Sequence, residues 1–463
     1  MAPGVRRVLV WINGFCVVAL LAAGITAVLL HEEEPRHPDA WDPRVVSLVQ
    51  FVEKERGYTF EHPVFVDFLT AAEYSERTRI DEEALAAEDV EDLQQGEALL
   101  RAFGLISSDV DLLETVNDLS DTGTLAYYDS VEERVTVRGT EITPELRATL
   151  VHELTHVLQD QSFDLDRFGE DGEEVSDGQV MAFQALAEGD AGRIEHAYLD
   201  SLSEEEQEAI GGGSEDAASE FEEEGPSQAV AALFAAGYIL GDPFVKLLET
   251  VSRAKVDEAF LDPPKSEEHV LDPFAYLDGD QPRPVATPSL DGADVRDDGD
   301  FGAASLLVVL AERIDVRQAL KAVTGWGGDA YAVFERDGRT CARVDVTGDT
   351  PADTDELDAA LRAWSAAAPR GSATSTRQGE LVELESCDPG SQATAGSGGA
   401  FEALGLAQFR TMIAIEALDK GAARGEARCY STTLVDEANL DEVAFERALR
   451  EAVGIAERCR IGD

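Results

Sequence analysis

Residues 143–165 read TPELRATLVHELTHVLQDQSFDL, and the rest of the chain can be organised around this stretch. Thr143 and Pro144 predict the start of a helix, because a threonine hydroxyl can accept a hydrogen bond from a free backbone amide and proline suits the first helical position. Apolar residues follow at helical spacing and form one stripe: Leu146, Leu150, Leu154, Val157 and Leu158. We therefore expect an amphipathic helix whose apolar face packs on a core.

The same helix contains the run His152-Glu153-Leu154-Thr155-His156. Residues four apart point in similar directions on a helix, so His152 and His156 can bind one metal ion. Glu153 points about 100° away, where it can hold a water molecule but cannot act as a third ligand. With 7 histidines in 463 residues, chance produces this pattern in on the order of one such sequence in 100. The alternative is a surface helix with two incidental histidines, and the apolar stripe argues against it.

A catalytic zinc site needs three protein ligands and one open position. Glu188 is the first choice for the third ligand, because it lies on a predicted helix over residues 177–199 whose neighbouring small residues allow close approach. Glu195 and His196 are the alternatives, while Asp190 points to a different face. Glu188 could also be an ordinary helix carboxylate, of which this chain has many.

Asp160 lies one turn beyond His156 on the predicted helix. It could accept a hydrogen bond from a ligating imidazole and so determine the tautomer of that ring. A solvent-exposed acid is an equally good interpretation of this position.

The segments around this helix predict an α+β catalytic domain. Residues 45–56 and 81–103 have helical patterns, and residues 63–69 have the pattern of a strand. Residues 124–128 and 134–138 predict two more strands, of which the second alternates valine with polar residues. Because this alternation is typical of a half-buried strand, we expect it at a sheet edge, where an extended peptide could pair with it.

A strand, a helix with H-E-x-x-H and a downstream helix with a glutamate together resemble the gluzincin class of zinc metallopeptidases. The resemblance covers roughly residues 63–200. The spacing from His156 to Glu188 is longer than in the familiar members, and the usual Asn-Glu-x-x-x-Asp setting of the third ligand is absent. Residues 146–161 are also similar to a group of largely uncharacterised bacterial zincin-like proteins that are secreted or membrane-anchored.

The resemblance implies a zincin-like fold, bound Zn²⁺ and hydrolysis of peptide bonds in a peptide or protein substrate. Glu153 would act as the general base that takes a proton from water and passes it to the leaving amine. A tyrosine or histidine usually stabilises the oxyanion in this class, and Tyr238 and His269 are the candidates. The main alternative is a catalytically inactive zincin-fold binding or assembly protein with a structural zinc, but a structural site has no use for the base Glu153.

Residues 8–30 form an apolar run that is long enough to span a bilayer as a helix. Arg6 and Arg7 precede this run and three glutamates follow it, so the positive-inside rule places the N-terminus in the cytoplasm and the rest outside the cell. A cleaved signal peptide is the alternative, but residues 25–27 make a poor cleavage site. We expect a retained, single-pass membrane anchor. An intramembrane protease is not expected, because the histidines lie over a hundred residues from the span.

The chain has a formal net charge of −57, which argues against binding to nucleic acid or to an anionic membrane surface. A solvated surface suited to high salt explains this charge better than a preference for cationic substrates. Four cysteines lie beyond the span, and an even set agrees with an oxidising location. Proximity in the sequence within each expected C-terminal subdomain predicts the pairs Cys341 with Cys387 and Cys429 with Cys459, with free thiols as the alternative.

Beyond the catalytic domain, residues 301–400 predict a mixed α/β subdomain. It contains a β-α-β-like unit with strands in 331–346, a helix over 353–368 and a strand over 380–387. The expected organisation is an anchor (1–30), a linker (31–44), a zincin-like metallopeptidase domain (45–280), a linker (281–300), the α/β subdomain (301–400) and a helical C-terminal subdomain (401–463).

Overall fold

The computed structural model describes residues 37–80, 85, 87–123, 125–168, 175–207, 210, 228–290, 293, 295–437, 452 and 454–460. The expected membrane span over residues 8–30 lies outside this part of the chain. Among the described residues, one helix, Gln228–Val251, is long and apolar enough to cross a membrane. Most of that helix is buried inside the protein, as is usual for a core helix.

The chain forms two compact units, and the fold is α+β. The first unit comprises Met1–Glu97, Asp109–Val175 and Ala187–Ala235; the second comprises Ala98–Ser108, Ser176–Leu186 and Ala236–Asp463. Residues 236–280, which we expected in the catalytic domain, therefore belong to the second unit. The expected linker over 281–300 contains a strand of the second unit's sheet.

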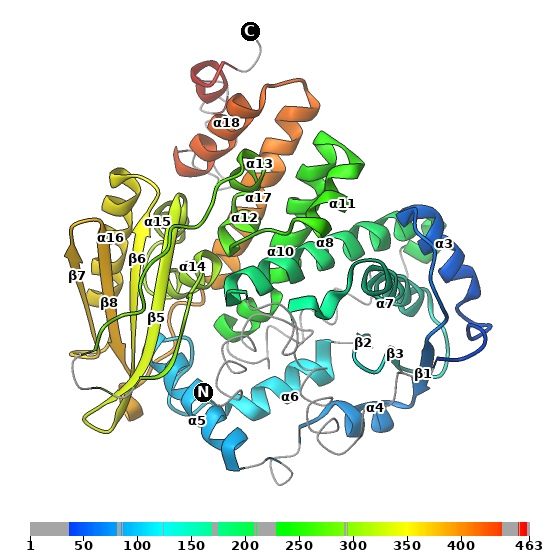
Figure 1. Ribbon diagram of the computed structural model, residues 1–463, viewed down its shortest axis with the longest axis horizontal. Helices are drawn as coiled ribbons and strands as arrows, with labels where there is room; N and C mark the ends of the chain where they lie inside the picture. Colours follow the sequence, from blue (N-terminus) through cyan, green and yellow to red (C-terminus); the bar gives the residue numbers. More distant parts are fainter. Residues whose placement is uncertain are drawn as a thin grey trace. The chain divides into compact units, whose positions relative to one another are not determined.

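The sequence predicted some helices of the first unit but not others. Those in or entering the first unit are α3 (Val46–Arg56), α4 (Ala71–Thr78), α5 (Ala87–Phe103), α6 (Leu112–Gly123), α7 (Pro144–Phe163), the 3-10 turn η2 (Leu165–Phe168), α8 (Asp177–Ser201) and α10 (Gln228–Val251). The pattern of the sequence predicted α3, α7 and α8 closely, but it did not predict α4 or α6. Figure 1 shows these elements along the chain.

The sheet of the first unit has the order β1-β3-β2, with β1 (Phe65–Leu69) parallel and β2 (Ala126–Asp129) antiparallel to β3 (Arg134–Arg138). Our placement of residues 134–138 at a sheet edge is therefore wrong, because β3 is paired on both sides. Its polar Thr136 is buried as well as its valines. The reason is the unpredicted helix α4, whose Tyr74 packs edge-on against Tyr127, the neighbour of Thr136 across the ladder.

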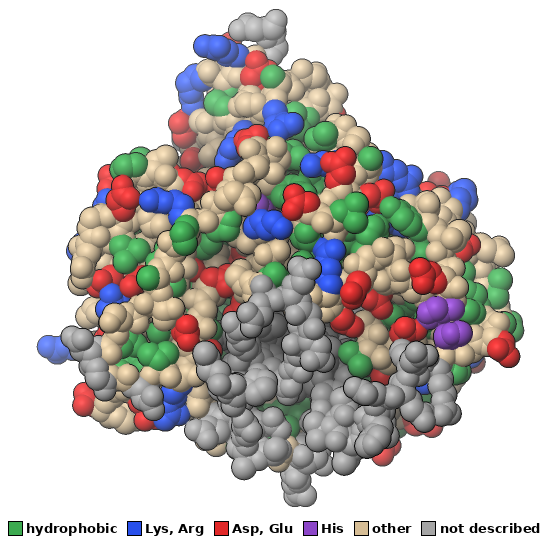
Figure 2. Space-filling view, in the orientation of Figure 1, with side chains coloured by type: hydrophobic (Ala, Val, Ile, Leu, Met, Phe, Trp, Pro, Cys, Tyr) green, Lys and Arg blue, Asp and Glu red, His purple; other side chains and the backbone are tan. Residues whose placement is uncertain are grey.

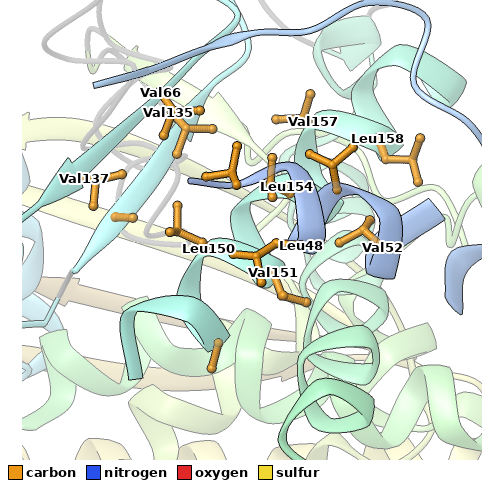
Figure 3. Close-up of a cluster of buried hydrophobic side chains, with 14 of the residues drawn as sticks. Leu48, Val52, Val66, Val135, Val137, Leu150, Val151, Leu154, Val157 and Leu158 are labelled. Atoms are coloured by element: carbon orange, nitrogen blue, oxygen red, sulfur yellow. The ribbon is translucent and has the colours of Figure 1, made fainter. Parts of the chain in front are cut away.

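The core of the first unit lies between this sheet, α3 and α7, as Figure 3 shows. Thr143 caps α7 as expected, since its side chain accepts a hydrogen bond from the amide of Leu146. Leu150, Leu154 and Val157 have no exposed surface. Burying an aliphatic side chain of this size stabilises a fold by about 1.5–3 kcal/mol. Packing of the apolar stripe thus fixes the orientation of α7 and, with it, the direction in which its histidines point.

The second unit contains a five-stranded sheet in the order β4-β5-β6-β8-β7, and every neighbouring pair is antiparallel (Figure 1). The expected β-α-β-like unit is therefore an antiparallel arrangement, and helix α16 packs on β6, β7 and β8. The strands are β4 (Val295–Gly299), β5 (Trp326–Arg336), β6 (Arg339–Gly348), β7 (Ala373–Gln378) and β8 (Leu381–Cys387). The helices are α11 (Arg253–Leu261), α12 (Glu267–Leu271), α13 (Pro273–Asp278), α14 (Ala303–Ala311), α15 (Val316–Val323), α16 (Pro351–Ala367), η3 (Gly390–Gln392), α17 (Ala400–Asp419) and α18 (Arg424–Glu437).

Both expected disulfides are present. Cys341 and Cys387 lie opposite each other on β6 and β8, and Cys429 of α18 is bonded to Cys459. Each bond closes a loop, which restricts the unfolded chain and stabilises the folded state. On the face drawn in Figure 2, acidic and basic side chains are interspersed.

Candidate metal centre

Three side chains of the first unit converge on one point. His152 Nε2 lies 3.0 Å from Glu188 Oε2 and 3.0 Å from His156 Nε2. His156 Nε2 lies 3.3 Å from the same glutamate oxygen. The two histidines come from α7 and the glutamate from α8. The structure thus brings together all three predicted ligands.

These separations fit a zinc ion. Ligand atoms about 2.0–2.1 Å from a tetrahedral zinc are about 3.3 Å apart, close to the separations of the three atoms here. Two imidazole nitrogens and one carboxylate oxygen are also ligands that zinc accepts. No metal is needed to explain the helix packing, but the three polar groups are buried and face one another. Their arrangement therefore fits the first coordination shell of a zinc ion.

The second ring nitrogen of each histidine, Nδ1, has a hydrogen-bond partner of its own. His152 Nδ1 lies 3.1 Å from Glu195 Oε2, and His156 Nδ1 lies 2.9 Å from Gln159 Oε1. Both partners are acceptors, so each Nδ1 donates a proton and each Nε2 keeps a lone pair for a metal. Glu195, an alternative third ligand, thus lies on the outer side of His152. His196, the other alternative, is exposed.

Gln159 is itself held in place by two hydrogen bonds. Its amide donates to the carbonyl of Ala187 and to Asp190 Oδ2, each over 3.0 Å. Asp190 has no exposed surface and accepts from Arg56 Nε over 2.6 Å and from Arg193 over 2.7 Å. Burial would raise the pKa of Asp190, but Arg56 and Arg193 lower it below its usual value. A charged network therefore links α3, α8 and α7 behind the metal-binding face.

Glu153 lies beside this group and is buried. Burial raises the pKa of its carboxyl to about 7, although the two histidines act to lower it. The carboxylate also accepts a hydrogen bond from the backbone amide of Tyr128. Backbone hydrogen bonds between antiparallel strands form at every second residue. Leu125 is bonded to Arg138 of β3, so Tyr128, three residues later, is at a position that makes no backbone hydrogen bond to β3. Its amide thus points outward from the sheet edge, toward Glu153.

The charges of the three candidate ligands depend on one another. Burial alone would lower the pKa of His152, but hydrogen bonds to Glu188 and Glu195 outweigh it and leave that pKa raised. Burial would likewise raise the pKa of Glu188, but the neighbouring histidines hold it well below its usual range. The buried, anionic Glu188 thus needs a positive charge beside it to be stable. Either protons on the histidines or a metal cation can supply that charge.

The remaining predicted site residues are Asp160, Tyr238 and His269. Asp160 accepts hydrogen bonds from the Tyr128 hydroxyl and the amide of Leu165, so Gln159, not Asp160, orients a ring. Tyr238 and His269 belong to the second unit, not to the unit that contains the metal-binding group. Both nitrogens of His269 are used there, by the amide of Lys265 and the carbonyl of Asp280. His269 therefore has a structural role.

Replacement of Gln159 by methionine, which is similar in length, is expected to weaken zinc binding by about 10–100-fold, as is usual when an outer partner of a ligand is lost. The physical reason is that the His156 ring loses the acceptor that sets its tautomer. The measurement is competition for zinc with a coloured chelator. Gln161→Met is the control, because Gln161 lies on the same helix but, among the residues that the structure describes, bonds to backbone groups of Glu61 and His62. Equal weakening by both variants would contradict the assigned role.

A family model described as a domain of unknown function (DUF8575) matches residues 291–395. No curated protein and no solved structure matches the chain. The matched region lies in the second unit and contains the five-stranded sheet. It includes none of the three candidate ligands, so the metal-binding group must be interpreted from its own geometry.

Proposed function

We propose that this protein is a zinc-dependent endopeptidase of the gluzincin-like type. The observation that supports this most directly is the convergence of His152, His156 and Glu188 with Glu153 beside them. In the proposed site the first three residues hold zinc, and Glu153 is the general base. An apolar N-terminal segment and two disulfides support a further proposal, that the chain is anchored in the cell membrane with its catalytic unit outside.

Zinc, when bound, supplies a Lewis acid that makes water more acidic and polarises the scissile carbonyl. Glu153 takes the proton that the attacking water loses and delivers it to the leaving nitrogen. Burial acts to raise the pKa of Glu153, which favours its uptake of that proton. The amide of Tyr128 orients the carboxylate, and Glu195 and Gln159 orient the two imidazoles.

The substrate would pair with β2 and not, as the sequence led us to expect, with β3. Within the described sheet β2 is an edge strand, and its Tyr128 is already in contact with Glu153. A peptide added to an open strand gains main-chain hydrogen bonds along its length. This arrangement favours extended or unfolded polypeptides as substrates.

The full-length protein, purified in detergent, is expected to contain about one zinc per chain and to cleave an unfolded protein substrate. Removing zinc with 1,10-phenanthroline should abolish cleavage, and adding zinc back should restore it. The measurements are elemental analysis and gel assays of cleavage. Bound zinc without hydrolysis across a broad peptide library would instead support the alternative, a binding or assembly protein with a structural zinc.

A further inference from the structure

We propose that Glu268, Asp280 and Asp349 of the second unit form a second metal site, one that binds a hard divalent cation such as calcium. Glu268 lies on the short helix α12, Asp280 follows α13, and Asp349 follows β6. One carboxylate oxygen from each lies within 4.8 Å of the others. Three segments that are separate in the sequence thus direct acids at one point.

Glu268 is the residue that distinguishes this group from an ordinary acidic surface. Only 3% of it is exposed, yet no hydrogen bond or ion pair reaches its carboxylate from any residue that the structure describes. A buried charge without a partner is costly, so such groups are normally paired or bound to a metal. Asp280 is half-buried and Asp349 is exposed. The group therefore opens to solvent on one side, where a cation could enter and keep water ligands.

The shortest hydrogen bonds of the nearby arginines go to other groups, and Arg428 acts on Glu268 only through the longer-range attraction of its charge. Arg428 donates to Asp272 over 2.7 Å, and Arg283 donates to the carbonyl of Gly348 over 2.6 Å. Three carboxylate oxygens within 4.8 Å of one another repel each other when all three groups are charged. Either a shared proton or a bound cation must therefore compensate the cluster at neutral pH.

The chemistry of the donors indicates the class of cation. All three offer carboxylate oxygen and none offers nitrogen or sulfur, which is the preference of calcium, magnesium and manganese and unlike that of zinc. Calcium takes six to eight oxygens in flexible geometry, so three protein oxygens leave places for water. Sites of this kind in extracellular proteins bind calcium at about 10⁻⁴–10⁻³ M.

The test is calcium binding to the zinc-loaded, full-length protein by equilibrium dialysis, together with its melting temperature at constant ionic strength. We expect one saturable calcium per chain and a rise of about 1–3 °C in the melting temperature at ten times the dissociation constant. Glu268→Gln should bind no calcium, and its melting temperature without calcium should equal or exceed that of the wild type. Asp349→Asn, at an exposed position, should weaken binding about tenfold or more.

Two controls separate a real site from screening of this acidic chain. Glu335→Gln removes one exposed acid of the same unit and should keep the full calcium response. The double variant His152→Ala, His156→Ala should also keep it, which would show independence from the zinc centre. The proposal is overturned if the wild type binds no calcium, as a proton-sharing cluster would behave. It is equally overturned if Glu335→Gln loses the response as fully as Glu268→Gln does.

Discussion

Glu153→Gln is expected to retain zinc and to lower kcat/KM toward an unfolded protein substrate by about 10³-fold, within the range found for general acid–base catalysis. Glutamine has nearly the shape of glutamate but cannot take up a proton. Its side-chain oxygen can still accept the hydrogen bond that the amide of Tyr128 gives to Glu153. The variant should therefore fold and bind zinc as before.

The measurement is steady-state hydrolysis with zinc content determined on the same sample. Glu145→Gln is the matched control, because Glu145 lies on the same helix but is exposed in its first turn. It should leave the rate within about twofold, as expected of an exposed position. Wild-type activity of Glu153→Gln would exclude Glu153 as the base, whereas a loss of both zinc and activity would show a structural role instead.

Local patterns in the sequence were sufficient to predict α7 and the direction of its histidines. The cap at Thr143, the apolar stripe and the four-residue spacing all depend on one helix, so each could be read without knowing the rest of the fold. Both disulfides were also predictable, since each pairs the two cysteines of one expected subdomain. Glu188 was found because small residues surround it, which is a local signal for close packing.

The features that were missed depend on contacts between distant segments. The central position of β3 follows from its parallel pairing with β1 and from the packing of α4 over the sheet. Neither contact can be predicted from the sequence of residues 134–138. Helix geometry places Asp190 on a different face from Glu188, and that direction lets it accept hydrogen bonds from Gln159 and Arg56. One signal was available: Gln159 lies three residues after His156, on the same side of the helix.

The double variant His152→Ala, His156→Ala is expected to lose zinc altogether, because two of three ligands are gone. Glu188→Gln should also weaken zinc binding by more than the about 10–100-fold that loss of an outer partner causes. Glu195→Gln should stay within that range, because Glu195 contacts the outer nitrogen of His152. The measurement is zinc affinity by chelator competition at one pH.

This comparison also decides between the two carboxylates that the sequence left open. His37→Ala, His62→Ala is the matched control for the double variant, since these two histidines stack on each other and take no part in the metal-binding group. It should keep one zinc per chain. If Glu195→Gln lost zinc as completely as Glu188→Gln, the third ligand would have to be reassigned to Glu195, and α8 would have to bring a different turn to the histidines when zinc binds.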